Sequence, residues 1–345
     1  MNVLDETYFK FSGRIYKKNN HAFLGYTNSS VTFYVKSTST PANVHLVLST
    51  KDNGEVNEAR LRVYVDDVEN DSLLILNKEV QTLPLIQLED TLIHKITIVK
   101  ITEAAMSYAC IEDILLKNTM LIPLPETEDK RLKVEFIGDS ITCGYGVLGQ
   151  PESEYHIREE DGEKTYAYFL SKDLDLNARY LCVSGYGVYL SYDAILENVL
   201  PNVYPYTNFF LSKDQLIDPT EFVPDLIVIN LGTNDSGHFE KEGVKEEFLH
   251  AYQEFLLQLK EFYPSVKILC ICGTLCQNVF PYINEAVTTL TKEGISDLYS
   301  FELPYHDVAS DSMASFHPSI QTHKKDAIRL SSIIKGLFKE YYPMT

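Results

Sequence analysis

The hydrophobic pattern of the chain changes once along its length, and this change constrains the fold more than any other feature. Between Phe23 and about Leu115, apolar and polar residues alternate in short runs such as SVTFYVKS, NVHLVLST and ARLRVYVDD. Later in the chain the apolar runs are continuous: KVEFIG, RYLCVSG, DLIVINLG and VKILCICG. Alternation is typical of strands with one buried face, whereas continuous runs are typical of strands buried on both faces. The chain is therefore expected to contain two different kinds of sheet.

The point of change separates two predicted domains. Residues 1–122 are predicted to form an all-β sandwich, because short alternating strands follow one another between turn-rich pieces. Residues 123–130, with Pro123, Pro125 and a charged run, are predicted to be a linker. Residues 131–345 are predicted to be an α/β domain with a parallel sheet, since each continuous run is followed by a segment long enough for a helix. The segment GVKEEFLHAYQEFLLQLKEFY has the clearest helical period.

The charge of the chain restricts its partners. With 30 basic and 49 acidic residues, the formal net charge is -19 at pH 7, which repels phosphate backbones and anionic lipid surfaces. Nucleic acid, membranes and polyanionic glycans are therefore not expected as partners, whereas a neutral ligand is compatible. The chain begins without a basic and apolar leader, and no apolar run reaches the ~18 residues that span a bilayer, so a cytoplasmic location is expected. The sequence does not decide whether the protein forms a homo-oligomer.

Three of the six cysteines, Cys270, Cys272 and Cys276, fall in the apolar run KILCICGTLC. Successive side chains of a strand face opposite sides, which does not suit a shared metal ion. Burial in a strand explains these thiols better than a disulfide framework does. We expect reduced thiols, no metal site and no cofactor.

Three polar segments, FIGDS, SGYG and LGTND, begin where continuous runs end. In an open parallel sheet the ligand crevice lies beyond the carboxyl ends of the strands, so these segments are expected to meet at one site. Ser140 follows its run through Gly138 and Asp139, and a tight turn there would lift its hydroxyl above the sheet edge. The competing interpretation is a serine that begins a helix as its N-cap.

Two other motifs in this segment are rejected by their context. Gly144, Gly146 and Gly149 have the spacing of a dinucleotide-binding loop, but they begin well beyond the apolar run and are followed by Pro151. Thr142 stands where the nucleophile elbow of an α/β-hydrolase has its second glycine, so an ordinary α/β-hydrolase is disfavoured.

The segments GDSITCGYG, SGYG and LGTND and a late His-Pro pair occur in the order of the four sequence blocks of the SGNH hydrolases, which the chain resembles. The resemblance implies a flavodoxin-like three-layer α/β domain. It also implies that Ser140 is the nucleophile and His317 the general base. The oxyanion hole would comprise the backbone amides of Ser140 and Gly185 and the side-chain amide of Asn234.

The residue types suit these roles. The side-chain amide of Asn234 has two N–H donors and no charge to titrate, and Gly185 admits a close backbone approach that a side chain would block. Each residue also has a simpler interpretation as part of a turn. His317 is followed by Pro318 and Ser319 just before the helical pattern IQTHKKDAIRLSSIIKGLF, which favours a loop that enters a helix.

The chain departs from the family just before His317. Many relatives have an aspartate two or three residues earlier, where this chain has Ser315 and Ala314. Either Asp311 or Asp307 reaches the imidazole ring, or a backbone carbonyl accepts its N–H and the catalytic group is a Ser-His dyad. We favour the dyad, because a carbonyl can hold the tautomer although it supplies no negative charge.

A β-sandwich before an SGNH domain is similar to the arrangement in carbohydrate esterase family 2, and GDSITCGYGV is close to the first block of that family. This similarity implies a jelly-roll sandwich and an acetyl xylan esterase that removes acetyl groups from xylo- or manno-oligosaccharides of the plant cell wall. Phe316, Tyr145 and Tyr186 are candidates for an apolar platform under a sugar ring, with ordinary packing as the simpler interpretation for the tyrosines. A narrow pocket would select acetyl by its size.

Two other functions stay open. A lipase, lysophospholipase or thioesterase of the same fold would act on longer acyl chains, and p-nitrophenyl esters from acetate to decanoate separate it from a deacetylase. A carbohydrate-binding protein with a vestigial site would explain the missing aspartate. The intact Ser140, Asn234 and His317 argue against that function.

Overall fold

The computed structural model describes residues 2–51, 57–70 and 73–342. Contacts between Cα atoms divide the chain into two compact units. The first unit comprises Met1–Asp129 and Thr207–Gln215, and the second comprises Lys130–Tyr206 and Leu216–Thr345. The return of Thr207–Gln215 to the first unit is a feature that the sequence did not indicate. No helix in the described ranges is long and apolar enough to cross a bilayer.

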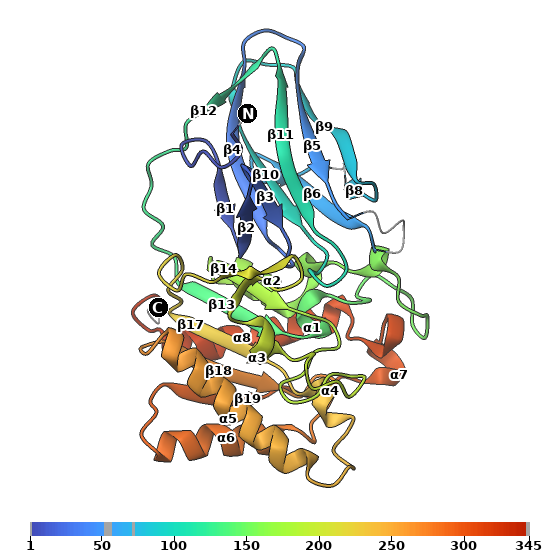
Figure 1. Ribbon diagram of the computed structural model, residues 1–345, viewed down its shortest axis with the longest axis vertical. Helices are drawn as coiled ribbons and strands as arrows, with labels where there is room; N and C mark the ends of the chain where they lie inside the picture. The colour runs from blue at the N-terminus through green and yellow to red at the C-terminus, as the bar shows by residue number, and fades with distance from the viewer. Residues whose placement is uncertain (1, 52–56, 71–72, 343–345) are drawn as a thin grey trace. The chain divides into compact units, whose positions relative to one another are not determined.

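The first unit is built from two antiparallel sheets (Figure 1). One sheet has the order β1, β4, β10, β6, β7, with β12 beside β4 and β8 beside β6, and the other has the order β2, β3, β11, β5, β9. The strands are β1 (Lys10–Ser12), β2 (Ile15–Lys18), β3 (His21–Leu24), β4 (Ser30–Ser37), β5 (Ala42–Ser49), β6 (Ala59–Val65), β7 (Val68–Glu69), β8 (Leu74–Leu76), β9 (Val80–Leu88), β10 (Ile93–Lys100), β11 (Ala109–Lys117) and β12 (Thr119–Ile122).

Alternation directs every second side chain of these strands into one core. In β4, Val31, Phe33 and Val35 are buried, and Thr32 and Tyr34 between them are only partly buried. Val44 and Leu46 of β5, in the other sheet, belong to the same buried cluster. The core lies between the two sheets, so the predicted all-β sandwich is confirmed.

The second unit contains a parallel sheet in the order β14, β13, β17, β18, β19. Its strands are β13 (Lys133–Gly138), β14 (Asn177–Cys182), β17 (Leu226–Asn230), β18 (Lys267–Cys272) and β19 (Leu298–Glu302). Every residue of β17 is buried, as expected for a strand covered on both faces. The order of the strands is that of flavodoxin-like doubly wound folds, so the predicted α/β domain is confirmed.

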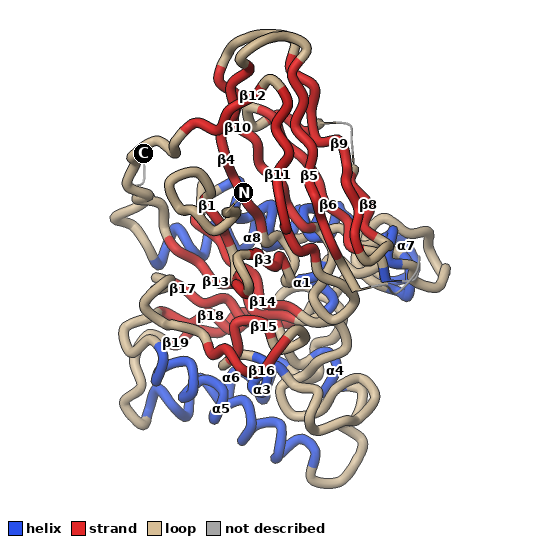
Figure 2. Tube along the Cα trace, turned by 45° about the horizontal axis from the view of Figure 1, so that its top comes forward, coloured by secondary structure: helices blue, strands red, loops and turns tan. Residues whose placement is uncertain are grey.

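Helices cover both faces of this sheet, with α8 on one side and α5 and α6 on the other (Figure 2). Leu170 of α2 and Leu330 of α8 share a buried cluster with Phe136 and Val228 of the sheet. The helices predicted most clearly from the sequence form as α5 and α8. The helices are α1 (Ser140–Cys143), α2 (Tyr166–Asp173), α3 (Leu200–Val203), α4 (Thr233–Ser236), α5 (Val244–Phe262), α6 (Phe280–Lys292), α7 (Val308–Asp311) and α8 (Ile320–Leu337). Short 3-10 turns lie at Ile157–Glu159, Gly162–Lys164 and Ala314–Phe316. A separate two-stranded sheet consists of β15 (Tyr206–Asn208) and β16 (Ser212–Leu216).

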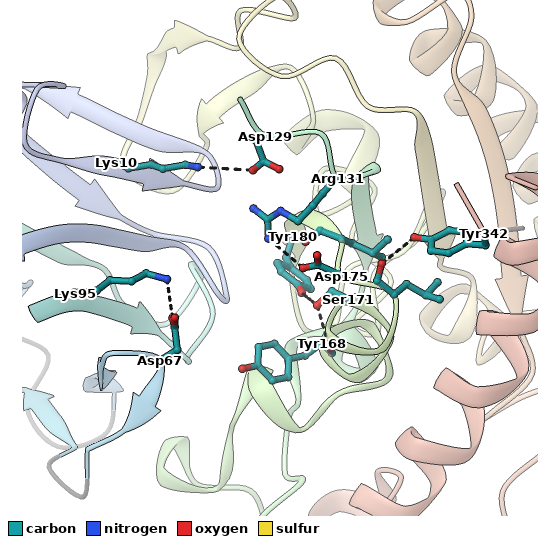
Figure 3. A network of polar contacts seen from close by, with 12 residues as sticks. Lys10, Asp67, Lys95, Asp129, Arg131, Tyr168, Ser171, Asp175, Tyr180 and Tyr342 are labelled. Carbon is teal, nitrogen blue, oxygen red and sulfur yellow. Dashed lines mark hydrogen bonds and ion pairs between the residues drawn. The ribbon is translucent and has the colours of Figure 1, made fainter. Parts of the chain in front are cut away.

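Hydroxyl groups fasten α2 to the sheet. Ser171 Oγ donates to the carbonyl of Tyr168 at 2.8 Å and lies 2.8 Å from the hydroxyl of Tyr180 in β14 (Figure 3). At the start of α2, the hydroxyl of Tyr166 lies 3.0 Å from Oγ1 of Thr142 in α1. Because these buried hydroxyls are paired, α2 supports the turn beyond β13 without an unsatisfied polar group at these contacts.

The strand order reverses at β13, which has β14 on one side and β17 on the other. Gly138, the last residue of β13, is level with Cys182 of β14 and Asn230 of β17. The three segments that follow these residues therefore start at one edge of the sheet. In doubly wound folds the ligand crevice forms at this reversal of strand order.

Candidate active site

Ser140 is the first residue of α1, directly after the turn that ends β13. Asp139 has extended backbone angles (φ -103°, ψ -150°), and its Oδ1 accepts a hydrogen bond from the amide of Ile141 at 3.0 Å. Asp139 is therefore the N-cap of α1, and the interpretation of Ser140 as an N-cap is wrong. The hydroxyl of Ser140 is not used for capping and is available for another role.

His317 comes from the turn before α8, and its ring reaches Ser140. Its Nε2 atom lies 2.8 Å from Oγ of Ser140, which is a hydrogen-bond distance. Ser315 and Phe316, with φ of 51° and 62°, form a tight left-handed turn just before the histidine. Ser319 caps α8 with its side chain, so the predicted loop that enters a helix is confirmed.

The second ring nitrogen of His317, Nδ1, lies 3.0 Å from the carbonyl oxygen of Ser315. A carbonyl only accepts, so Nδ1 carries the proton and Nε2 is left to accept the proton of Ser140. Burial lowers the pKa of His317 to about 4, although the carbonyl of Ser315 opposes the shift. The imidazole is therefore neutral at neutral pH, as a general base must be.

The two aspartates considered as a third catalytic residue bind elsewhere. Asp311 accepts hydrogen bonds from the hydroxyls of Ser319 and Thr322 at the start of α8. Asp307 is the N-cap of α7. In the part of the chain that the structure describes, neither carboxylate bonds to His317. This placement corrects the alternative in which one of them reaches the ring, because a carbonyl nearer in sequence already occupies Nδ1.

N–H donors stand at the ends of all three neighbouring strands. Asn234, in α4 beyond β17, donates from Nδ2 to the carbonyl of Tyr186 at 2.9 Å, which leaves its second N–H for a ligand. Within residues 2–51, 57–70 and 73–342, the backbone amides of Ser140 and Gly185 have no acceptor. Unsatisfied donors of this kind are what a site that binds an oxyanion requires.

The backbone angle explains the glycine at position 185. Gly185 has a φ of +79°, in the region that favours glycine. A Cβ atom at this position would meet only Cβ of Tyr192, 3.9 Å away. Packing of the described residues therefore does not exclude a side chain here, which corrects the expectation of a close approach that a side chain would block. The positive φ is what favours glycine.

Two of the predicted aromatic side chains lie at His317. Phe316 precedes it in the turn and is 56% exposed. The ring centroid of Tyr145 lies 4.7 Å from that of His317, and Tyr145 also stacks on Tyr155 with centroids 3.6 Å apart. Tyr145 therefore contacts the ring of the base, and Phe316 is the exposed residue next to it in the chain.

Tyr186 and Tyr192 lie in the segment after β14. The hydroxyl of Tyr186 donates a hydrogen bond to Oδ1 of Asn198 at 3.3 Å, which holds this side chain against its own segment of the chain. Tyr192 is 72% exposed, and its amide donates to the carbonyl of Gly185 at 2.8 Å. Tyr192 was not predicted as a site residue, because its position beyond the SGYG segment belongs to no motif.

Two of the three glycines with dinucleotide-like spacing, Gly146 and Gly149, pack against the loop that carries His317. A Cβ atom at Gly146 would lie 2.7 Å from the carbonyl oxygen of Ala314, and one at Gly149 would lie 2.5 Å from Cβ of Ala314. These glycines permit close packing of two loops, which accounts for them without a bound phosphate.

Comparison with known proteins identifies relatives of the chain. It matches the model of the GDSL-like lipase/acylhydrolase family over residues 136–325. It is 30% identical over 252 residues to the cellulase/esterase CelE of Acetivibrio thermocellus, and this match covers 70% of this chain and 30% of CelE. It is 23% identical over 203 residues to an acetylxylan esterase/glucomannan deacetylase of Cellvibrio japonicus, and this match covers 58% of this chain and 55% of that protein. The chain thus spans from about a third to about half of the length of these relatives.

A solved structure resembles the chain over nearly its whole length. It is a family two carbohydrate esterase from Clostridium thermocellum in complex with cellohexaose. The two chains are 25% identical with a TM-score of 0.85, and the match covers 96% of this chain and 99% of that one.

Proposed function

Because the chain belongs to the GDSL-like lipase/acylhydrolase family, we propose that it is a serine esterase that removes O-acetyl groups from plant cell-wall oligosaccharides. The observation that carries the proposal is the 2.8 Å contact between Ser140 Oγ and His317 Nε2 at the edge of the sheet where the free N–H donors stand. A nucleophile, a base and preorganised donors are the groups that ester hydrolysis needs.

In the first half of the proposed reaction, His317 takes the hydroxyl proton of Ser140 as Oγ attacks the acetyl carbonyl. The imidazolium that forms keeps its Nδ1–H on the carbonyl of Ser315, so the ring does not turn while it holds the proton. The acetyl oxygen becomes negative and accepts hydrogen bonds from the amides of Ser140 and Gly185 and from Asn234.

In the second half, the acetyl group leaves the enzyme. His317 gives its proton to the sugar oxygen, which departs as a hydroxyl, and an acetyl-enzyme remains on Ser140. Water then attacks this ester with His317 again as base, and the proton returns to Oγ as acetate is released.

Several features support an acetylated neutral sugar as the substrate. The net charge of -19 disfavours an anionic glycan. Exposed Phe316 offers an apolar face for a sugar ring beside the catalytic base. The relative from Cellvibrio japonicus is an acetylxylan esterase/glucomannan deacetylase, and the similar structure contains cellohexaose. These relatives support acetylated xylo- or manno-oligosaccharides for this chain.

Hydrolysis of p-nitrophenyl esters from acetate to decanoate tests the proposal. We expect kcat/KM to be highest for acetate and to fall with chain length, because a pocket for acetyl excludes longer chains. Release of acetate from acetylated xylo- and manno-oligosaccharides, with the Ser140→Ala protein as the blank, then identifies the sugar. Activity that rises with chain length would instead indicate a lipase or thioesterase.

A further inference from the structure

The loop after β14 carries the amide of Gly185 but has little regular structure of its own. Residues 183–190 form turns and bends with one isolated bridge, between Gly187 and Val199. Such a segment must find partners for its backbone N–H groups outside a regular ladder. Three of these N–H groups donate to one side chain, the carboxylate of Asp235 in α4.

Asp235 is fully buried and accepts hydrogen bonds from three consecutive backbone amides. Its Oδ1 lies 2.8 Å from the amide nitrogens of Tyr189 and Leu190, and its Oδ2 lies 3.0 Å from that of Val188. A carboxylate has acceptor sites only, so it can satisfy several N–H groups at once. Hydrogen bonds to a charged acceptor are also the stronger kind.

Asn234, next to Asp235, also bonds to this loop, but here the side chain is the donor and the loop backbone is the acceptor. Asn234 donates its side-chain N–H to the carbonyl of Tyr186 at 2.9 Å. Gly187 lies between these contacts, and a Cβ atom there would be 2.4 Å from Oδ2 of Asp235. The carboxylate therefore lies directly against the backbone of the loop, with no room for a side chain between them.

Two of the three proposed oxyanion donors lie close to this contact in the chain, because Gly185 stands three residues before Val188 and Asn234 is the neighbour of Asp235. We propose that Asp235 is a positioning residue that fixes the Gly185 amide and the Asn234 side chain relative to each other. The inference rests on the proposed esterase function. Asp235 acts through these two donors and does not touch the reacting atoms.

The variant Asp235→Asn tests this role. Asparagine keeps the size of the side chain and one acceptor oxygen, but its Nδ2 presents hydrogens to the amide of Val188, which loses its acceptor at Oδ2. With p-nitrophenyl acetate, we expect kcat per folded protein to fall about 100-fold while KM stays within about threefold, because a displacement of about 1 Å in a catalytic donor costs about this much. A kcat equal to that of the wild type would overturn the inference.

A double-mutant cycle with Asn234→Ala separates positioning from a general effect on the fold. If Asp235 acts through the oxyanion hole, the two losses in kcat combine to less than their product, because Asn234→Ala already removes a donor that Asp235 positions. Losses that multiply would show that the two residues act independently and would refute the role.

Glu135→Gln is the matched control. Glu135 is also fully buried and accepts hydrogen bonds from Arg179 at 2.8 Å and Tyr204 at 2.7 Å. Its substitution removes a buried charge outside the Asp235 contact, so Tm is expected to fall while kcat per folded protein is unchanged. An equal loss of kcat in this variant would assign the effect of Asp235→Asn to lost stability and contradict the inference.

If Asp235→Asn does not fold, Gly187→Ala tests the same contact from the loop. A Cβ atom there would lie 2.0 Å from the carbonyl oxygen of Leu190 and 2.4 Å from Oδ2 of Asp235, so the methyl group would force the loop and the carboxylate apart. The same loss of kcat and the same cycle with Asn234→Ala are expected, and full activity would overturn the role of Asp235. A wild-type protein without activity on p-nitrophenyl acetate would overturn the proposed function itself, so the two failures are distinguishable.

Discussion

The Nδ1 atom of His317 lies 3.0 Å from the carbonyl oxygen of Ser315, a residue of the same turn. This contact selects the tautomer in which Nε2 faces Ser140. A carboxylate in this place would also stabilise the imidazolium by its charge, and a carbonyl does so less strongly. Burial lowers the pKa of the ring and the carbonyl of Ser315 offsets this only in part, so the basicity of His317 is a property that experiments can measure.

We expect the acid side of the pH profile of kcat/KM to lie unusually low. Burial lowers the pKa of His317 to about 4, so the neutral base persists well below the usual histidine range. With p-nitrophenyl acetate, activity should be retained at about pH 5.5 and fall with an apparent pKa near 4, since this profile reports the free enzyme's essential base. A fall centred at about 6.5 would contradict the buried setting of the ring.

Neither aspartate near the histidine should matter for turnover. Asp311 binds hydroxyls at the start of α8, so Asp311→Asn is expected to change kcat by no more than about threefold and to lower Tm slightly. Loss of a true triad acid costs about 10⁴ in kcat. Steady-state kinetics of Asp311→Asn and Asp307→Asn distinguish these outcomes, and a loss near the larger value would restore the acid to the catalytic group.

Removal of either member of the pair should abolish turnover. Ser140→Ala and His317→Gln are each expected to lower kcat by at least about 10⁴-fold, and the double variant should be little worse, because the two groups act as a unit. The measurement is acetate release, with folding checked by circular dichroism. Undiminished turnover in Ser140→Ala would show that the nucleophile is another residue.

Phe316→Ala should separate binding of the sugar from the chemistry. Because this ring is exposed beside His317, we expect KM for an acetylated oligosaccharide to rise about tenfold, which corresponds to the loss of roughly one ring-stacking contact. For p-nitrophenyl acetate, which lacks the sugar, kcat/KM should stay within about twofold. Equal losses on both substrates would mean that the ring supports the turn of His317 instead.

Stability should decrease in mild acid because of a second buried histidine. Burial lowers the pKa of His323 to about 3, and its Nδ1 accepts the amide N–H of Tyr166 at 3.1 Å. The unfolded chain therefore binds more protons, and stability is lost as the pH falls from about 6.5 towards the folded value. In His323→Gln, Tm should depend less on pH over this range than in the wild type. An unchanged slope would contradict the prediction.

The sequence by itself determined the two kinds of sheet and the identity of the main catalytic candidates. Alternation as in Ser30–Ser37 and the continuous run of Leu226–Asn230 reflect burial on one face or on two, which is a local property of each strand. Ser140 and His317 were identifiable because each stands in a short motif of fixed order. Such patterns say what faces the core, but they do not say which distant atoms meet.

Only the tertiary structure decided the partners of these residues. The carbonyl of Ser315 reaches His317 because two consecutive residues adopt left-handed angles, which no residue type there signals. The contact of Asp235 with Val188, Tyr189 and Leu190 joins segments from the ends of two strands that are not adjacent in the sheet. Hydrogen bonds between such segments depend on strand order and backbone angles, and these are settled only when the whole sheet is packed.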